Sequence, residues 1–255
     1  MSEQHPARVS GHQDPAGEAP WAMPIVVRVE KHALPTHTAV CEAAARAVSL
    51  LLTDDRSQPG GEWAAAIERW EDGRIRKVVR RARSAKWVAT AVLPHVEIEH
   101  AGASVRAFVP GPTDQVPAAL AKLQVSGLDL AADAGDAGDA RDAGDAAVNA
   151  VEAADRRDDE VTPPPHALAV SIALTPHVRL TTGKAAAQCA HAAQLAARRL
   201  DPERLHAWVD AGSPVHLTFP DEAAWADLVR CAPVRVTDAG FTEIPPGTDT
   251  TLAWW

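Results

Sequence analysis

The sequence has few cysteines and no long hydrophobic run. Its three cysteines, Cys41, Cys189 and Cys231, have no paired spacing, which excludes a disulfide scaffold and favours a reducing compartment, so we predict the cytoplasm. No apolar stretch reaches the roughly 20 residues that a membrane span requires, and residues 1–20 lack the pattern of a secretory signal. We therefore expect no membrane partner. Because the cysteines and nearby histidines lack the spacing of metal ligands, we also expect no metal.

Basic residues are outnumbered, and the net charge of -9 is unevenly distributed. Residues 131–160 contain ten acidic and three basic residues in an Ala/Gly/Asp background. With almost nothing apolar to bury, such a segment cannot offset its ordering entropy. The predicted organisation is a disordered tail (1–20), an accessory α/β domain (24–128), a disordered acidic linker (131–165) and a second domain (166–255).

Strand and helix signals alternate along the second domain. An apolar run over 167–174 precedes an Ala-rich helix near 184–199, and shorter helices begin at Asp201-Pro202 and Pro220-Asp221. Further short strands are expected at 215–219, 233–237 and 250–255. This order predicts an α/β fold, a compact mixed β-sheet with helices on both faces.

The first domain weakly repeats the second. Residues 67–73 are similar to 205–212, and residues 105–110 are similar to 215–220. A period of this length indicates a duplicated domain rather than a solenoid. We therefore interpret the first domain as a degenerate duplicate, in which the insert 74–102 has no counterpart.

Residues 74–86 carry seven bases and no acid. Such a run can bind RNA phosphates, and we take Arg76, Lys77, Arg80 and Arg81 as the contacts. A solvated helix face, or a patch held by the protein's own acidic linker, is the competing interpretation.

The segment from Gly183 to Ala192 places several polar groups on one helical face. At about 100° per residue, Lys184, Gln188 and His191 project together. Gly183 permits close approach to the backbone, and the amides of the first turn attract anions.

This segment is not a nucleotide-binding loop. Such a loop has a glycine five positions before Gly183, where Val178 stands, and a Ser or Thr after Lys184, where Ala185 stands. We expect no nucleotide cofactor.

A second motif lies between Asp238 and Thr248. Asp238 ends a predicted strand, Gly240 permits a sharp turn, and Pro246-Gly247 fits the central positions of a type II turn. If this strand runs beside the first strand of the domain, Asp238 and Lys184 become neighbours.

The two motifs resemble the signatures of the type 2 peptidyl-tRNA hydrolases, a family shared by archaea and eukaryotes. Gly-Lys, Ala-Gln and His-Ala stand in the helix, and Asp-Ala-Gly, Thr, Ile and Gly-Thr stand near the C-terminus. The resemblance covers about 167–255. It implies an enzyme that cleaves the ester between peptide and tRNA, with peptidyl-tRNA as its partner and no metal or other cofactor.

The resemblance also implies roles for individual residues. Lys184 and Asp238 occupy catalytic positions, and Thr242 is expected to position the water or the ribose. The expected substrate-binding residues are Gly183, Gln188, His191 and Gly240. Ester hydrolysis suits this set, because Asp238 can orient or deprotonate a water while Lys184 stabilises the oxyanion.

The chain departs from the family pattern at two positions. Phe241 replaces a basic residue or histidine, and Glu243 replaces glutamine, so a positive side chain is missing from the expected tRNA contact. In the first domain, Thr38 aligns with Lys184, and no Asp-Ala-Gly segment is visible. Glu42 and Ala45 align with Gln188 and His191, so we expect that domain to be catalytically inactive.

Other interpretations stay open. Lys184 and Asp238 could be an ordinary surface ion pair, worth less than about 1 kcal/mol. The protein could be a non-catalytic RNA-binding or regulatory protein that keeps the fold, or a dimerisation module without an enzymatic role. Formation of a homodimer is left open.

Overall fold

The computed structural model describes residues 17–131, 168–238 and 244–255. We call residues 17–131 the N-terminal half and the described residues from 168 onward the C-terminal half. Almost all of the predicted linker and most of the predicted tail lie outside the described residues. Residues 17–20 are described, and Glu18 forms an ion pair with Arg69 at 2.6 Å.

The N-terminal half contains a mixed sheet with strand order β2-β1-β4-β3. β1 pairs in parallel with β2 and antiparallel with β4, while the short β5 pairs with the start of β1. Its elements are β1 (Trp21–Arg28), α1 (His37–Thr53), η1 (Asp55–Ser57), α2 (Ala64–Glu71), β2 (Lys77–Ala82), α3 (Ser84–Ala89), η2 (Thr90–Val92), β3 (His95–His100), β4 (Ala103–Phe108), β5 (Gly111–Pro112) and α4 (Ala118–Ala121).

The C-terminal half contains a second mixed sheet with strand order β7-β6-β9-β8. β6 pairs in parallel with β7, and β9 is antiparallel to both β6 and β8. Its elements are β6 (Val170–Leu174), α6 (Thr182–Ala197), α7 (Pro202–Asp210), β7 (Val215–Thr218), α8 (Glu222–Cys231), β8 (Val234–Thr237) and β9 (Asp249–Trp254). The predicted α/β class, with helices on both faces of mixed sheets, is confirmed.

The two sheets have the same topology. β2, β1, β4 and β3 correspond in order and direction to β7, β6, β9 and β8. The predicted match of 105–110 with 215–220 is therefore wrong, because β4 is an inner antiparallel strand and β7 is a parallel edge strand. The segment 74–102 has a counterpart after all, since it contains β2, α3 and β3. Residues 105–110 and 215–220 are both apolar strands followed by proline. This local pattern predicts where a strand ends, but it does not predict which position the strand takes in the sheet.

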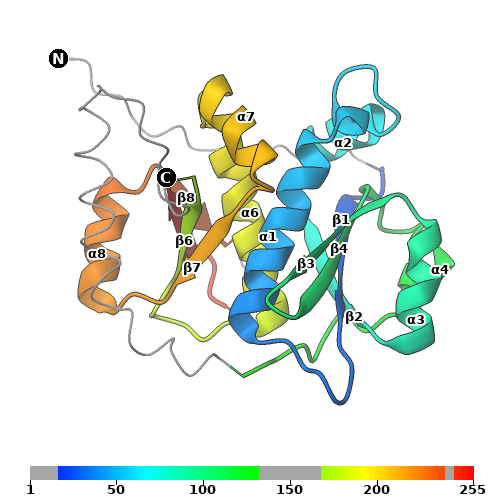
Figure 1. Cartoon of the computed structure of the whole chain (residues 1–255), viewed down its shortest axis with the longest axis horizontal. Helices are drawn as coiled ribbons and strands as arrows, with labels where there is room; N and C mark the ends of the chain where they lie inside the picture. Colours follow the sequence, from blue (N-terminus) through cyan, green and yellow to red (C-terminus); the bar gives the residue numbers. More distant parts are fainter. Residues whose placement is uncertain (1–16, 132–167, 239–243) are drawn as a thin grey trace.

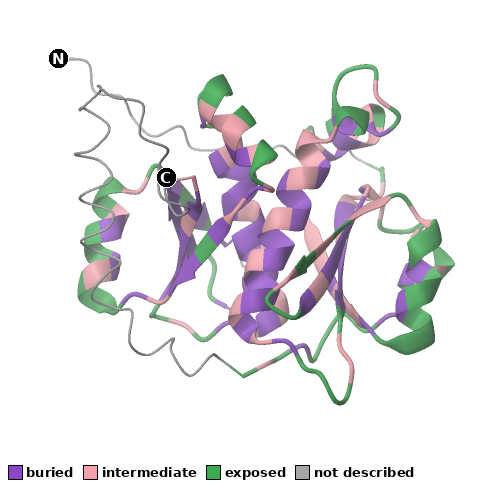
Figure 2. Ribbon diagram, in the orientation of Figure 1, coloured by how far each residue is buried: buried purple, intermediate pink, exposed green. Residues whose placement is uncertain are grey.

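The molecule has layers, with the two sheets on either side of a central pair of helices. α1 and α6 lie between the sheets, α8 covers the outer face of the C-terminal sheet, and α3 and α4 cover the outer face of the N-terminal sheet (Figure 1). The inner faces of both sheets and both central helices form one continuous hydrophobic cluster. Figure 2 shows that the central helices are largely buried, whereas the outer helices expose one side. The two halves therefore share one core.

The central helices lie side by side and run in the same direction. At their N-terminal ends, His37 Nδ1 is 3.0 Å from Thr182 Oγ1, and at their C-terminal ends they line a common cleft. Both helices bury many alanines, whose small side chains let the two backbones approach closely. Each begins at a threonine N-cap, Thr36 or Thr181, whose hydroxyl accepts a hydrogen bond from the amide three residues later.

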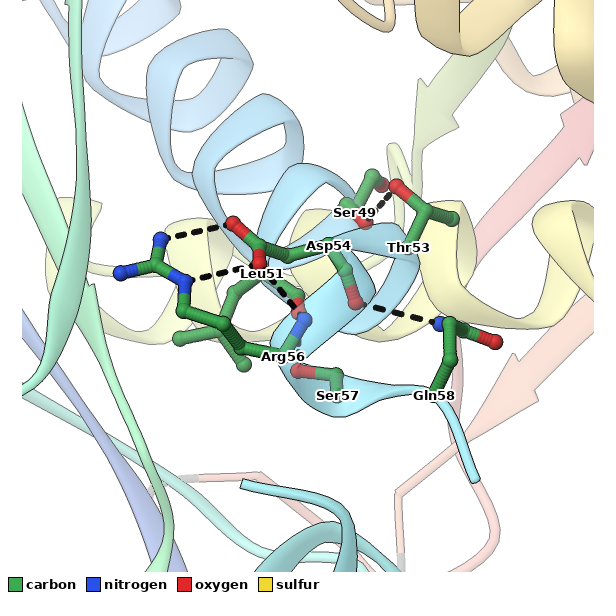
Figure 3. A network of polar contacts seen from close by, with 7 residues as sticks. All are labelled: Ser49, Leu51, Thr53, Asp54, Arg56, Ser57 and Gln58. Carbon is green, nitrogen blue, oxygen red and sulfur yellow. Dashed lines mark hydrogen bonds and ion pairs between the residues drawn. The ribbon is translucent and has the colours of Figure 1, made fainter. Parts of the chain in front are cut away.

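α1 ends in a local polar network (Figure 3). Ser57 Oγ donates to the Leu51 carbonyl at 2.6 Å, and the Gln58 amide donates to the Asp54 carbonyl at 3.4 Å. The Asp54 carboxylate accepts from the Arg56 guanidinium at 2.7 and 2.8 Å. These bonds satisfy carbonyls that a helix end leaves without intrahelical partners. They reverse the chain toward α2 and β2, which bring the N-terminal half to the site described below.

Among the helices of the described residues, none combines the length and the apolar character that crossing a lipid bilayer requires.

Candidate active site

The N-terminal turns of α6 present three polar side chains to one cleft. Thr181 Oγ1 accepts a hydrogen bond from the Lys184 amide at 3.4 Å, which fixes where the helix begins. Lys184, Gln188 and His191 then line the cleft together, as the helical spacing predicts. One face of α6 is thus directed away from the core toward this opening.

Asp238 reaches the same place from the end of β8. The condition considered from the sequence, that its strand runs beside β6, is not met, because β9 lies between β6 and β8. Lys184 and Asp238 still meet, since α6 packs across β6, β9 and β8. The Asp238 amide donates to the Thr248 carbonyl at 2.9 Å. The type II turn is also where the sequence placed it, with Gly247 at φ 81° in the left-handed region.

Two polar side chains of α6 converge on one carboxylate oxygen of Asp238. Lys184 Nζ forms an ion pair with Asp238 Oδ2, and Gln188 Nε2 donates to the same oxygen at 2.8 Å. Asp238 is 8% exposed, and the Lys184 side chain is 14% exposed. The pair is therefore not the ordinary surface ion pair of the alternative interpretation. Removing one member would leave the other buried without its counter-charge.

The cleft around this pair has a volume of about 520 Å³, within the range of small-molecule sites, about 300–1,000 Å³. Its walls come from both halves of the molecule. The C-terminal half contributes α6 and the end of β8. The N-terminal half contributes residues 74–79, around the start of β2, and residues 125–128, which follow α4.

Comparison with known proteins finds matches in the C-terminal half. Residues 168–254 match the family model described as peptidyl-tRNA hydrolase PTH2. Over these residues the chain is similar to the type 2 peptidyl-tRNA hydrolase family. It is 38% identical over 85 residues to "peptidyl-tRNA hydrolase 2, mitochondrial" of Bos taurus and 36% identical over 85 residues to the Homo sapiens protein of that name. Each alignment covers 29% of this chain and 48% of the relative.

The chain thus spans about half the length of the curated relatives that it matches. No solved structure matches. Because both relatives are described as mitochondrial, the cytoplasmic location stays a prediction. The N-terminal half, which contributes one wall of the cleft, lies outside the matched region.

Of the four predicted RNA contacts, two line the cleft and two do not. Arg76 and Lys77 line the cleft, whereas Arg80 and Arg81 are not among its lining residues. Arg81 donates to Gln124 Oε1 at 2.7 Å, and Arg80 donates to the Leu123 carbonyl at 3.5 Å. The solvated-helix interpretation is wrong for 77–82, because these residues form the edge strand β2.

Gly183 lies close to the backbone of the N-terminal half at Leu128. Its amide donates to the Leu128 carbonyl at 3.0 Å, so this first-turn donor is already used within the protein. A methyl group at Gly183 would meet Leu128 Cβ at 3.7 Å, an ordinary contact. The structure therefore gives Gly183 a role in joining the two halves beside the cleft. Gly240 and Thr242, like Phe241 and Glu243, lie outside the described residues.

The N-terminal half does not carry the corresponding site residues. The N-caps Thr36 and Thr181 are equivalent, which puts Ala39 opposite Lys184 and corrects the predicted match with Thr38 by one residue. By the same shift, Ala43 and Arg46 replace the predicted Glu42 and Ala45. The loop that carries Asp238 is also missing: β3 and β4 are joined by Ala101 and Gly102 alone, at φ 45° and 82°. Positive φ at both positions is typical of a tight hairpin turn.

Glu42 has a structural role in that half. Its Oε1 accepts from the Leu217 amide at 2.9 Å, and its Oε2 is 2.6 Å from His100 Nε2. Arg46 donates to the Gly212 carbonyl at 3.0 Å. These polar groups therefore join α1 to the C-terminal sheet.

Sequence reasoning missed most of the wall that the N-terminal half contributes. Arg74, Ile75, Val79 and Leu128 all line the cleft, and only the basic run gave a signal near them. Trp63 and Trp87, which flank or precede the basic run, are buried at 3% and 5% exposure and are not available to stack on RNA bases. Each packs under a guanidinium group, Arg56 at 3.7 Å and Arg106 at 3.9 Å.

Lys77 lines the cleft and belongs to a hydrogen-bond network between the two halves. Its Nζ donates to Gln194 Oε1 at 2.5 Å, and the Gln194 amide donates to Glu71 Oε1 at 2.9 Å. Burial of the amine lowers the pKa of Lys77 to about 7, with a further contribution from Arg198 against the opposing effect of Glu71. Burial, Lys77 and Arg198 also hold the pKa of His191 well below its usual range.

This network predicts a pH dependence of stability. Between pH 7 and about 10.5, the unfolded chain binds a proton at Lys77 that the folded protein does not hold, so the free energy of unfolding rises with pH in this range. We expect Lys77→Met to reduce that rise, measured by urea denaturation at pH 7.5 and 9.5, where His191 is neutral in both states. The exposed Lys86→Met is the control. An unchanged pH dependence in Lys77→Met would contradict this prediction.

Proposed function

We propose that the protein hydrolyses the ester bond that joins a peptide to the terminal ribose of tRNA. The observation that carries the proposal is the convergence of Lys184, Gln188 and Asp238 in one cleft of the peptidyl-tRNA hydrolase domain. A cleft of about 520 Å³ suits the aminoacylated end of a tRNA and leaves the body of the tRNA outside.

In the proposed reaction, Asp238 takes a proton from a water whose oxygen attacks the ester carbonyl carbon. An ammonium has three donors, so Lys184 can bind Asp238 and still donate to the developing oxyanion. The bond from the carbonyl carbon to the ribose oxygen then breaks, and the proton passes from Asp238 to that oxygen. Gln188 holds the carboxylate in place through its hydrogen bond at 2.8 Å.

The remaining predicted roles belong to the same proposal. His191 lines the cleft on the Lys184 face of α6, and we propose that it contacts the substrate. Thr242 is proposed to position the water or the ribose, and Gly240 to allow close approach. No metal takes part in the proposed reaction. Among the described residues, no group of three His, Cys, Asp or Glu side chains could hold a metal ion.

The experiment that tests this function is direct. The purified full chain is mixed with peptidyl-tRNA, and released peptide and deacylated tRNA are measured with and without EDTA. We expect multiple turnovers at a rate that EDTA does not change. Binding of the tRNA without cleavage would favour the non-catalytic RNA-binding alternative, and absence of both would favour a dimerisation module. Size-exclusion chromatography of the same sample tests the homodimer.

A further inference from the structure

One wall of the active cleft comes from outside the family domain. The lining residues Arg74, Arg76 and Val79 belong to the N-terminal half, whereas the family match begins at residue 168. The half without the catalytic residues therefore completes the site of the other half.

This wall is fixed to its surroundings by backbone contacts. The Arg76 carbonyl accepts from Trp70 Nε1 at 3.0 Å and from the Met23 amide at 2.9 Å. Trp70 is fully buried, so it anchors the strand start from the core. Because the backbone at this point is already fixed, only the side chain of Arg76 has to be ordered on binding.

The charge of the wall is opposite to that of the whole chain. Among the described lining residues, the basic side chains are Arg74, Arg76, Lys77 and Lys184, and the one carboxylate is Asp238. Because burial lowers the pKa of Lys77 to about 7, that amine contributes little positive charge above neutral pH. Asp238 is paired with Lys184, and nearby Glu71 forms an ion pair with Arg198 at 2.5 Å. In a chain of net charge -9, a cleft lined in this way attracts an anion locally. Guanidinium groups suit phosphates, which they can bind through two parallel hydrogen bonds.

We propose that Arg74 and Arg76 bind phosphates of the 3′-terminal nucleotides of the substrate while the ester carbonyl lies beside Lys184 and Asp238. The substrate end then lies between the two halves, and the N-terminal half supplies positive charge that the C-terminal motif lacks at Phe241. This inference rests on the proposed hydrolysis. It assigns the contact to Arg74 and Arg76, and not to Arg80 or Arg81.

The test compares two double variants from the same basic run. Arg74→Gln/Arg76→Gln alters the cleft, while Arg83→Gln/Lys86→Gln removes two exposed charges outside it. We expect the first variant to raise KM for peptidyl-tRNA about tenfold, as two lost charged contacts imply, with little change in kcat. The slope of log KM against log salt concentration should fall by about 1.4, or about 0.7 per lost phosphate contact on a single strand. The control should change neither value.

Two further measurements separate the possible failures. A peptidyl-adenosine ester, which has no phosphate, should be hydrolysed equally by both variants and the wild type. An acceptor-stem RNA that carries no peptide on its 3′ end should bind more weakly only to Arg74→Gln/Arg76→Gln. If the wild type binds this RNA but cleaves no ester, and only Arg74→Gln/Arg76→Gln weakens the binding, the proposed function fails and the phosphate contact stands. If the two double variants have the same KM, salt slope and RNA affinity, the phosphate contact is wrong whatever the activity.

Discussion

Replacing Lys184 by Met or Asp238 by Asn is expected to lower kcat for peptidyl-tRNA by about a hundredfold or more, the usual effect of losing an acid–base or electrostatic group. Both substitutions nearly preserve side-chain volume while removing the charge. Lys184→Met loses the donor for the oxyanion, and Asp238→Asn loses the proton acceptor. The measurement is single-turnover release of peptide, which isolates the chemical step from product release.

These variants need a control for stability, because breaking a buried ion pair can cost about 3–5 kcal/mol. Asp227 forms an exposed ion pair with Arg230 on α8, where the two side chains are 58% and 70% exposed. Asp227→Asn should therefore change stability by less than about 1 kcal/mol and leave activity unchanged. Rates are compared at temperatures where circular dichroism shows each variant folded. A folded Lys184→Met or Asp238→Asn protein with wild-type turnover would contradict the catalytic assignment.

Separating the two halves is expected to have the second large effect. The fragment 161–255 contains the region matched by the family model, but its helix α6 is buried on every side except the face that lines the cleft. A helix that is covered over most of its circumference belongs to the interior of a fold. Removing the N-terminal half would expose the alanine face that packs on α1, the Gly183 amide that binds Leu128, and one wall of the cleft.

We therefore expect the fragment to aggregate or self-associate and to lose at least tenfold in kcat/KM. Size-exclusion chromatography and thermal unfolding measure the first effect, and peptide release measures the second. Coexpression with residues 1–160 is the matched control and should restore both properties. The full chain should unfold in a single transition, because one core spans both halves. A monomeric fragment with the stability and activity of the full chain would show that the N-terminal half is dispensable.

Local signals allowed much of the C-terminal half to be predicted. The cap at Asp201, the turn over residues 245–248 and the polar face of α6 all lie where the sequence indicates. Each depends on residues a few positions apart, so the chain specifies it without knowledge of the rest of the fold. The shared face of Lys184, Gln188 and His191 follows from helical geometry alone.

The sequence by itself thus determined the helices, the turn and the chemistry of the residues that the family resemblance selects. Only the tertiary structure decided that β9 lies between β6 and β8, that 74–102 repeats 215–237, and that α1 covers α6. It also decided that a basic strand of the N-terminal half lines the cleft. The physical reason is that strand order and the packing of two halves depend on contacts between residues far apart in the chain. The composition of each segment limits such contacts without specifying them.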